Sequence, residues 1–111
     1  IMSSSLTRTI AYKMVAGFAK DELFSGVTTI RTVGGLGNFD TRLRDEIESG
    51  TKLGPRILAA NQGISVPGGH MAGSVAVAAS TIPDALKQLE KAKQEKVDLI
   101  KLMITGGVLF C

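Results

Sequence analysis

The chain has 111 residues, of which 44% are hydrophobic and 21% are charged. This length suffices for one small domain, and the composition is that of an ordinary globular protein, which argues against disorder. No apolar run reaches the roughly 18 to 20 residues of a membrane span, so no membrane partner is expected. The N-terminal residues do not combine a basic leader with an apolar core, which argues against a signal peptide, and a cytoplasmic location is the favoured expectation.

The net charge of +3 comes from dispersed lysines. The densest basic group, "KQLEKAKQEK", is interleaved with glutamate, which favours a solvated helix face over a nucleic-acid patch. With no tryptophan and few aromatics, no base-stacking platform is expected, and we predict no nucleic-acid partner. The single cysteine excludes an internal disulfide and a cysteine-rich metal site. The chain starts with Ile1 and ends on Cys111 after an apolar run, and we expect an internal fragment of a longer reading frame.

The first half of the chain predicts a helix, a strand and a second helix. Residues 5–23 place apolar side chains four residues apart, which predicts an amphipathic helix ending at Ser25-Gly26. The ladder consists of Leu6, Ile10, Met14 and Phe18, with Ala11 and Val15 alongside. The β-branched run 27–33 predicts a short strand bounded by glycines. The segment "TRLRDEIESG" predicts a helix with Asp40 or Thr41 as N-cap and Gly50 just past its end.

The second half predicts a strand, a long loop, a helix and a last strand. A strand is expected near residues 56–60, and the small-residue segment "ISVPGGHMAGSVAVAAS" is expected to be a loop. The clearest helix follows from Ser80 or Thr81 as N-cap, Pro83 in the first turn, and an apolar face; that face consists of Ile82, Leu86 and Leu89. "VDLIKLMI", residues 97–104, predicts the last strand.

The alternation of helices and strands predicts an α/β fold with about three parallel strands and right-handed crossovers. Because the last strand lacks polar alternation, we expect it to be covered on both faces. Three strands are too few for a closed sheet, but they would make a little under half of a (β/α)8 barrel.

Lys101 interrupts the apolar run of this last strand. The period of a strand places Leu99, Lys101 and Met103 on one face, and a buried ammonium is costly unless it is paired or loses its proton. The plain interpretation is a lysine that snorkels or forms a salt bridge near the strand end. Three functional alternatives stay open: a Schiff-base lysine, a phosphate-binding lysine, and a carboxylated lysine that bridges divalent metals.

Glycine-bearing loops follow all three predicted strands, at the end where parallel α/β folds carry their sites. "GLGNFD" supplies only two glycines of a dinucleotide fingerprint, and a phosphate-binding P-loop is absent from the sequence. His70, the only histidine, lies in the loop "PGGHM" and is either simply solvated or a substrate contact and proton carrier.

Four segments occur in the order found in one enzyme family: "SGVTTIRTVGG", "LRDEIESG", "GPRILAANQGISVPGGH" and "DLIKLMITGG". Together they resemble the metal-dependent amidohydrolases, in particular the branch of imidazolonepropionase-like and Xaa-Pro-dipeptidase-like enzymes. The resemblance covers about residues 26–107. It implies that residues 1–111 form part of a (β/α)8 catalytic barrel and supply its second to fourth strands.

The resemblance also implies an activity and site residues. The family hydrolyses amide, peptide or cyclic amide C–N bonds with a metal-held hydroxide. By this resemblance Lys101, as a carbamate, would be a metal ligand for two divalent ions, usually zinc, and His70 would contact a small dipeptide-like substrate. Because the other metal ligands and the catalytic aspartate would lie outside the chain, we expect the isolated 111-residue chain to be inactive. The resemblance is also compatible with an oligomeric parent enzyme.

One departure from the family pattern is Thr32, which stands where the family often has an aspartate. The alternative to the amidohydrolase hypothesis is a small flavodoxin-like module that binds a nucleotide or phosphate. In that module Lys101 would be a phosphate-binding or structural lysine.

Overall fold

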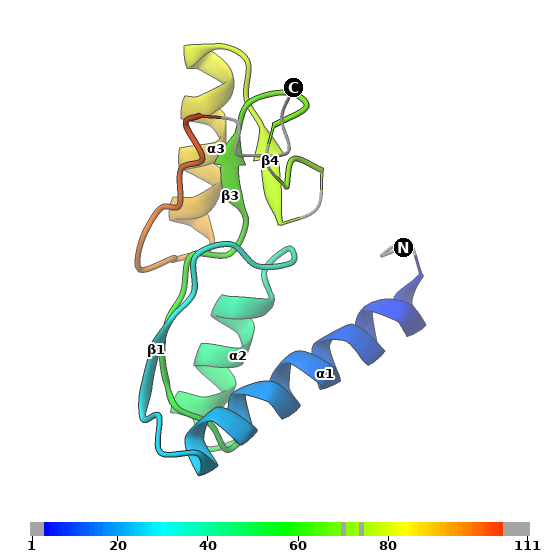
Figure 1. The fold of residues 1–111 in the computed structure, drawn as a ribbon, viewed down its shortest axis with the longest axis vertical. Helices are drawn as coiled ribbons and strands as arrows, with labels where there is room; N and C mark the ends of the chain where they lie inside the picture. The colour runs from blue at the N-terminus through cyan, green and yellow to red at the C-terminus, as the bar shows by residue number, and fades with distance from the viewer. Residues whose placement is uncertain (1–3, 70, 74, 106–111) are drawn as a thin grey trace.

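The computed structural model describes residues 4–69, 71–73 and 75–105. Three helices and four short strands follow one another along these residues, and Figure 1 shows their arrangement. In chain order they are α1 (Ser5–Phe24), β1 (Thr29–Arg31), α2 (Phe39–Glu48), β2 (Arg56–Leu58), β3 (Gly63–Ser65), β4 (Ala76–Ala78) and α3 (Ile82–Gln94). The predicted α/β class is confirmed, whereas a closed barrel is not formed by the described residues.

Local sequence determines the helix boundaries. The Oγ1 atom of Thr81 accepts a hydrogen bond from the Asp84 amide at 3.2 Å, which confirms the predicted N-cap of α3. Gly50 lies just past α2 with φ of 82°, a left-handed conformation that suits glycine. The predicted N-cap of α2 was wrong: Asn38 holds that position, and Asp40 lies in the first turn. The Asp40 carboxylate instead accepts a hydrogen bond from the Asn61 amide, 3.0 Å away.

Every strand pairing among the described residues is parallel, as predicted. β1 pairs with β2 through the register Ile30–Ile57, and β3 pairs with β4 through Ile64–Val77. The predicted loop over residues 64–80 was wrong in part, because β3 and β4 both form within or at the start of it. Pairing between β3 and β4 provides hydrogen-bond partners for backbone amide and carbonyl groups that the small side chains of this segment do not shield.

The last predicted strand, residues 97–104, is reduced to a single parallel bridge between Leu102 and Ile64. The expected burial on both faces was also wrong, because Ile100, Leu102 and Ile104 are 41%, 55% and 80% exposed. The alternation itself is as predicted: Lys101 and Met103 are half-buried on the other face. Among the described residues, this segment has a backbone neighbour on the β3 side and an open outer face.

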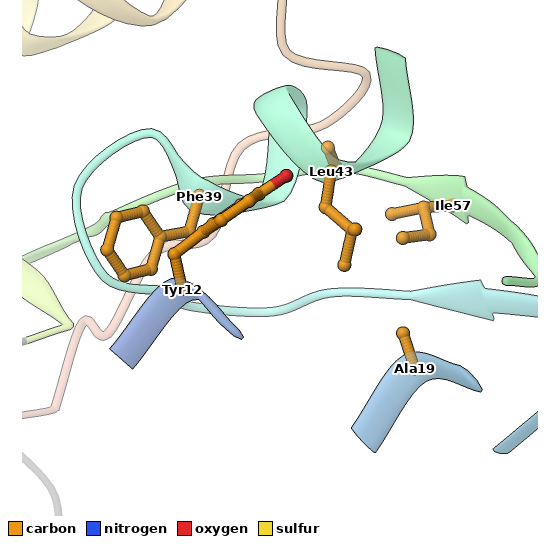
Figure 2. Close-up of a cluster of buried hydrophobic side chains, with 6 residues drawn as sticks. Tyr12, Ala19, Phe39, Leu43 and Ile57 are labelled. Atoms are coloured by element: carbon orange, nitrogen blue, oxygen red, sulfur yellow. The ribbon is translucent and has the colours of Figure 1, made fainter. Parts of the chain in front are cut away.

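The core lies where α1 and α2 cover β1 and β2. It contains Tyr12, Ala19, Phe39, Leu43, Ile57 and Ala59, and Figure 2 shows five of these labelled around one another. The rings of Tyr12 and Phe39 meet edge to face, with centroids 5.3 Å apart. This packing joins the first helix to the second and fixes both against the strands.

The large apolar residues predicted to line two helices do not pack. Along α1 the ladder Leu6, Ile10, Met14 and Phe18 is more than half exposed, whereas Ala11 and Val15, predicted alongside it, do pack against the core. The predicted face of α3 is also exposed, with Leu86 at 59%. Small side chains let a helix approach the strands closely, which explains why the smaller stripe of α1 faces the core.

Candidate functional site

The backbone around Lys101 is held by β3. The Ile64 amide donates to the Lys101 carbonyl oxygen at 2.9 Å, and the Met103 amide donates to the Ile64 carbonyl oxygen at 2.8 Å. These two bonds form one rung of a parallel ladder on either side of Ile64. Lys101 therefore lies beside the first residue of β3.

The side chain of Lys101 lies on the face of this ladder that points away from α3. Ile64 and Ile100 line a small cavity against Ala92 of α3, and the alternation of side chains along the ladder places that of Lys101 on the opposite face. A Cβ atom at Gly63 would lie 3.1 Å from Lys101 Cγ and 3.3 Å from Met103 Cε. The absence of a side chain at Gly63 thus provides the space along which the lysine stem packs.

A tight turn follows β3. The Gly69 amide donates to the Val66 carbonyl oxygen at 2.8 Å, with Pro67 and Gly68 between them and Gly68 at φ of 70°. Proline followed by a residue of positive φ is the pattern of a type II turn. The turn folds Gly69 back against Ser65, where a Cβ atom would lie 2.7 Å from Ser65 Oγ. His70 directly follows this turn in the chain and lies outside the described residues.

An ion pair between Arg44 and Asp98 holds the segment that connects α3 to Lys101. Arg44 Nη1 of α2 donates to Asp98 Oδ2 at 2.7 Å and to the Lys96 carbonyl oxygen at 2.9 Å. The same Asp98 oxygen accepts from the Ala59 amide at 2.9 Å, and the Asp98 amide donates to the Ala59 carbonyl oxygen at 2.8 Å. The Ala59 hydrogen bond and the Arg44 guanidinium hold the pKa of Asp98 below its usual value. This clamp sets where residues 98–101 enter the sheet.

A buried asparagine forms the bend between β2 and β3. Asn61 is 1% exposed and adopts a left-handed φ of 57°, which asparagine tolerates better than most residues. Its Oδ1 accepts from the Thr41 amide at 3.0 Å, and its Nδ2 donates to Thr41 Oγ1 and to Glu95 Oε1. Its carbonyl oxygen accepts from the Gly35 amide at 2.8 Å. The bend takes the chain from its pairing with β1 to its pairing with β4 and Leu102.

Thr32, the departure from the family pattern, has a definite contact. Its Oγ1 accepts a hydrogen bond from the Ala60 amide at 2.9 Å, and its own amide donates to the Leu58 carbonyl oxygen. The threonine hydroxyl therefore serves as a neutral acceptor at the end of β2, where a carboxylate was expected.

The described residues do not complete a metal centre. Over residues 4–69, 71–73 and 75–105, no group of three or more histidine, cysteine, aspartate or glutamate side chains is placed to hold an ion. Lys101 by itself would supply a single donor group, and only after carboxylation. A metal ion bound to this lysine would therefore need ligands other than the described residues. In the same part of the chain, no helix is long and apolar enough to cross a membrane.

Sequence reasoning missed three features of this site: the hydroxyl of Ser65, the Arg44–Asp98 clamp and the Asn61 bend. Ser65 lies within the segment predicted as a loop, where β3 forms. Arg44 and Asp98 are 54 residues apart, and no local pattern connects them. The one available signal was Asp98 itself, a carboxylate in an otherwise apolar strand pattern.

Comparison with solved structures reveals close relatives of this arrangement. A structure from Bifidobacterium longum described as a prolidase is 37% identical over 87% of this chain, with a TM-score of 0.78. A Xaa-Pro dipeptidase with methionine bound in its active site is 32% identical over 93% of the chain, with a TM-score of 0.77. The chain resembles the prolidase branch of the amidohydrolases. The resemblance predicted from four sequence segments is thereby confirmed.

The likeness of fold extends to a structure of lower sequence identity. The A. niger ochratoxinase matches 98% of the chain with a TM-score of 0.82, although only 17% of residues are identical, and this match concerns the fold alone. The chain spans about a quarter to a third of the length of these structures: 24%, 29% and 31%. No family model and no curated protein sequence matches the chain.

Proposed function

We propose that this chain is part of a metal-dependent hydrolase that cleaves amide bonds in small dipeptide-like substrates. The observation that carries the proposal is the 37% identity over 87% of the chain to a structure described as a prolidase. The Xaa-Pro dipeptidase, at 32% identity, supports the same substrate class. Within such an enzyme, residues 1–111 would supply the second to fourth strands of a catalytic barrel, in line with the parallel pairing of β1 with β2 and the parallel bridge between Ile64 of β3 and Leu102.

Within this proposal, Lys101 in its carboxylated form is a metal ligand and His70 contacts the substrate. Two features of the structure support the role of Lys101. Its carbonyl oxygen accepts a hydrogen bond from the Ile64 amide, and its stem packs into the space over Gly63. The cofactor we propose is a pair of divalent ions, with zinc as the first candidate. The remaining ligands would come from residues other than those described.

The test uses the full-length protein in which this chain occurs. Purified protein is assayed against Xaa-Pro dipeptides and, in parallel, against N-acyl amino acids and phosphate esters, before and after removal of metal with a chelator. We expect hydrolysis of the dipeptides that is lost with the chelator and regained when zinc is added back. Chelator-resistant activity would contradict the metal proposal, and phosphatase activity without amidase activity would contradict the substrate class.

A further inference from the structure

Ser65 Oγ is a buried polar atom that has no hydrogen-bond partner among residues 4–69, 71–73 and 75–105. The residue is 3% exposed, and among the described residues its hydroxyl oxygen is the buried side-chain polar atom with no hydrogen-bond partner. The Ser65 backbone is satisfied in another way, since its carbonyl oxygen accepts from the Ala79 amide at 2.8 Å. Burying a hydroxyl without a hydrogen bond costs free energy, so a group that completes it has to be sought nearby.

The hydroxyl lies on the same face of β3 as Lys101. Gly63 and Ser65 are two residues apart in the strand and so share one face, and the Lys101 stem packs against Gly63 on that face. Ser65 is about 6.6 Å further along the strand than Gly63. A lysine side chain that starts beside Gly63 and carries an additional carboxyl group spans this distance.

The surroundings of Ser65 limit what it can bind. Gly69 closes one side, because a Cβ atom there would lie 2.7 Å from Ser65 Oγ and 2.9 Å from the Val66 carbonyl oxygen. Met103 turns away from Ser65, with its Cε over Gly63 and Gly34. A free lysine ammonium has only donors and would leave the hydroxyl proton without an acceptor. A carboxylate at the end of Lys101 accepts that proton.

From this geometry we propose that Ser65 is a positioning residue that donates a hydrogen bond to the N-carboxylate of Lys101. The inference rests on the proposed function, in which Lys101 is carboxylated. In that reaction the lone pair of the neutral Lys101 amine attacks the carbon of carbon dioxide and a N–C bond forms. One C–O π pair moves onto oxygen, and the amine proton passes to water. No oxidation occurs, and the product is the anion that the Ser65 hydroxyl binds.

The test measures carboxylation directly instead of activity. Full-length protein is titrated with ¹³C-labelled bicarbonate, and the ¹³C NMR signal of the carboxylated lysine is followed in the wild type, Ser65→Ala, Ser65→Cys and Lys101→Met. Ser65→Cys keeps the number of side-chain heavy atoms, with a larger sulfur and a much weaker donor, and covers the case in which Ser65→Ala fails to fold. The Lys101→Met variant assigns the signal to Lys101.

We expect both Ser65 variants to need about tenfold more bicarbonate for half-maximal signal, the size expected for one hydrogen bond to a charged group. Without bicarbonate, Ser65→Ala should be no less stable than the wild type, because the variant removes an unsatisfied buried hydroxyl. Equal bicarbonate titrations in wild type and both variants would overturn the role of Ser65 while leaving the carboxylated lysine intact. A wild type with no signal at any bicarbonate concentration would overturn both.

Discussion

The Arg44–Asp98 clamp gives a sharp test of how the segment that carries Lys101 is held. Replacing Asp98 by alanine removes two hydrogen bonds to a carboxylate, one from Arg44 Nη1 at 2.7 Å and one from the Ala59 amide at 2.9 Å. Arg44 is 10% exposed in its side chain and keeps the Lys96 carbonyl oxygen and Asp45 as partners. The loss therefore falls mainly on Ala59 and on the entry of residues 98–101 into the sheet.

The expected magnitude follows from the number of bonds and their exposure. A hydrogen bond to a charged group contributes roughly 1.5–3 kcal/mol, and two of them are lost. Because 36% of the Asp98 side chain is exposed, water replaces part of this loss, and we expect a net cost of about 2 kcal/mol. If the Ala59 amide exchanges through local opening of this segment, its hydrogen-exchange protection falls about 30-fold.

Native-state hydrogen exchange at Ala59 measures this directly. The matched control is Asp45→Ala, which removes the same charge from the same arginine but at a site where 64% of the side chain is exposed. We expect the control to change Ala59 protection less than threefold. If Asp98→Ala also changed Ala59 protection less than threefold, or if both variants lost protection equally, the role assigned to the Arg44–Asp98 clamp would be refuted.

The clamp should also depend on pH with a defined sign. The Ala59 hydrogen bond, together with Arg44, lowers the pKa of Asp98 in the folded protein. A carboxyl group of lowered pKa stabilises the fold above its unfolded pKa of about 3.9, and this stabilisation is lost as pH falls through the folded value. After correction for intrinsic exchange, Ala59 protection should therefore decrease below about pH 4 in the wild type. In Asp98→Asn this decrease should be absent.

Two further predictions concern packing and the core. Gly69→Ala should lower the free energy of unfolding by about 2 kcal/mol, because the added Cβ would lie 2.7 Å from Ser65 Oγ. Gly17→Ala, in the middle of α1 with nothing near the added Cβ, should instead raise it by about 1 kcal/mol. Equal effects of the two substitutions in denaturant titrations would contradict this geometry. Tyr12→Phe removes the 2.8 Å hydrogen bond from the Tyr12 hydroxyl to Glu46 and should cost about 1 kcal/mol. Burial opposes ionisation of Glu46, but hydrogen bonds from Tyr12 and Arg42 keep the pKa of Glu46 below its usual value. Tyr12→Phe should therefore raise the pKa of Glu46, as measured by NMR titration.

The helices could be predicted from sequence because short-range chemistry determines them. The N-cap at Thr81, the proline in the first turn of α3 and the left-handed Gly50 after α2 each involve residues within four positions of one another. The burial of the helices could not be predicted in the same way. Both stripes of α1 are apolar, and only the position of α2 and the strands decides that the side with Tyr12 packs.

The candidate site was predictable at Lys101 and not around it. A cation in an apolar strand pattern is visible in one sequence, and four short segments indicated the enzyme family that the structural comparisons confirm. The partners of the site are remote in sequence. Arg44 reaches Asp98 across 54 residues, and β3 forms in a small-residue segment whose strand character depends on pairing with β4 and Leu102. Such pairings leave no periodic signal in the chain.

The metal content of a lysine variant tests the central claim most directly. Full-length wild type, Lys101→Met and the control Lys93→Met, which changes an exposed lysine of α3, are purified in parallel and their divalent metal per chain is determined, together with hydrolysis of an Xaa-Pro dipeptide. We predict bound metal and hydrolysis in the wild type and the control, and a loss of both in Lys101→Met. Full metal content and full hydrolysis in Lys101→Met would contradict the account.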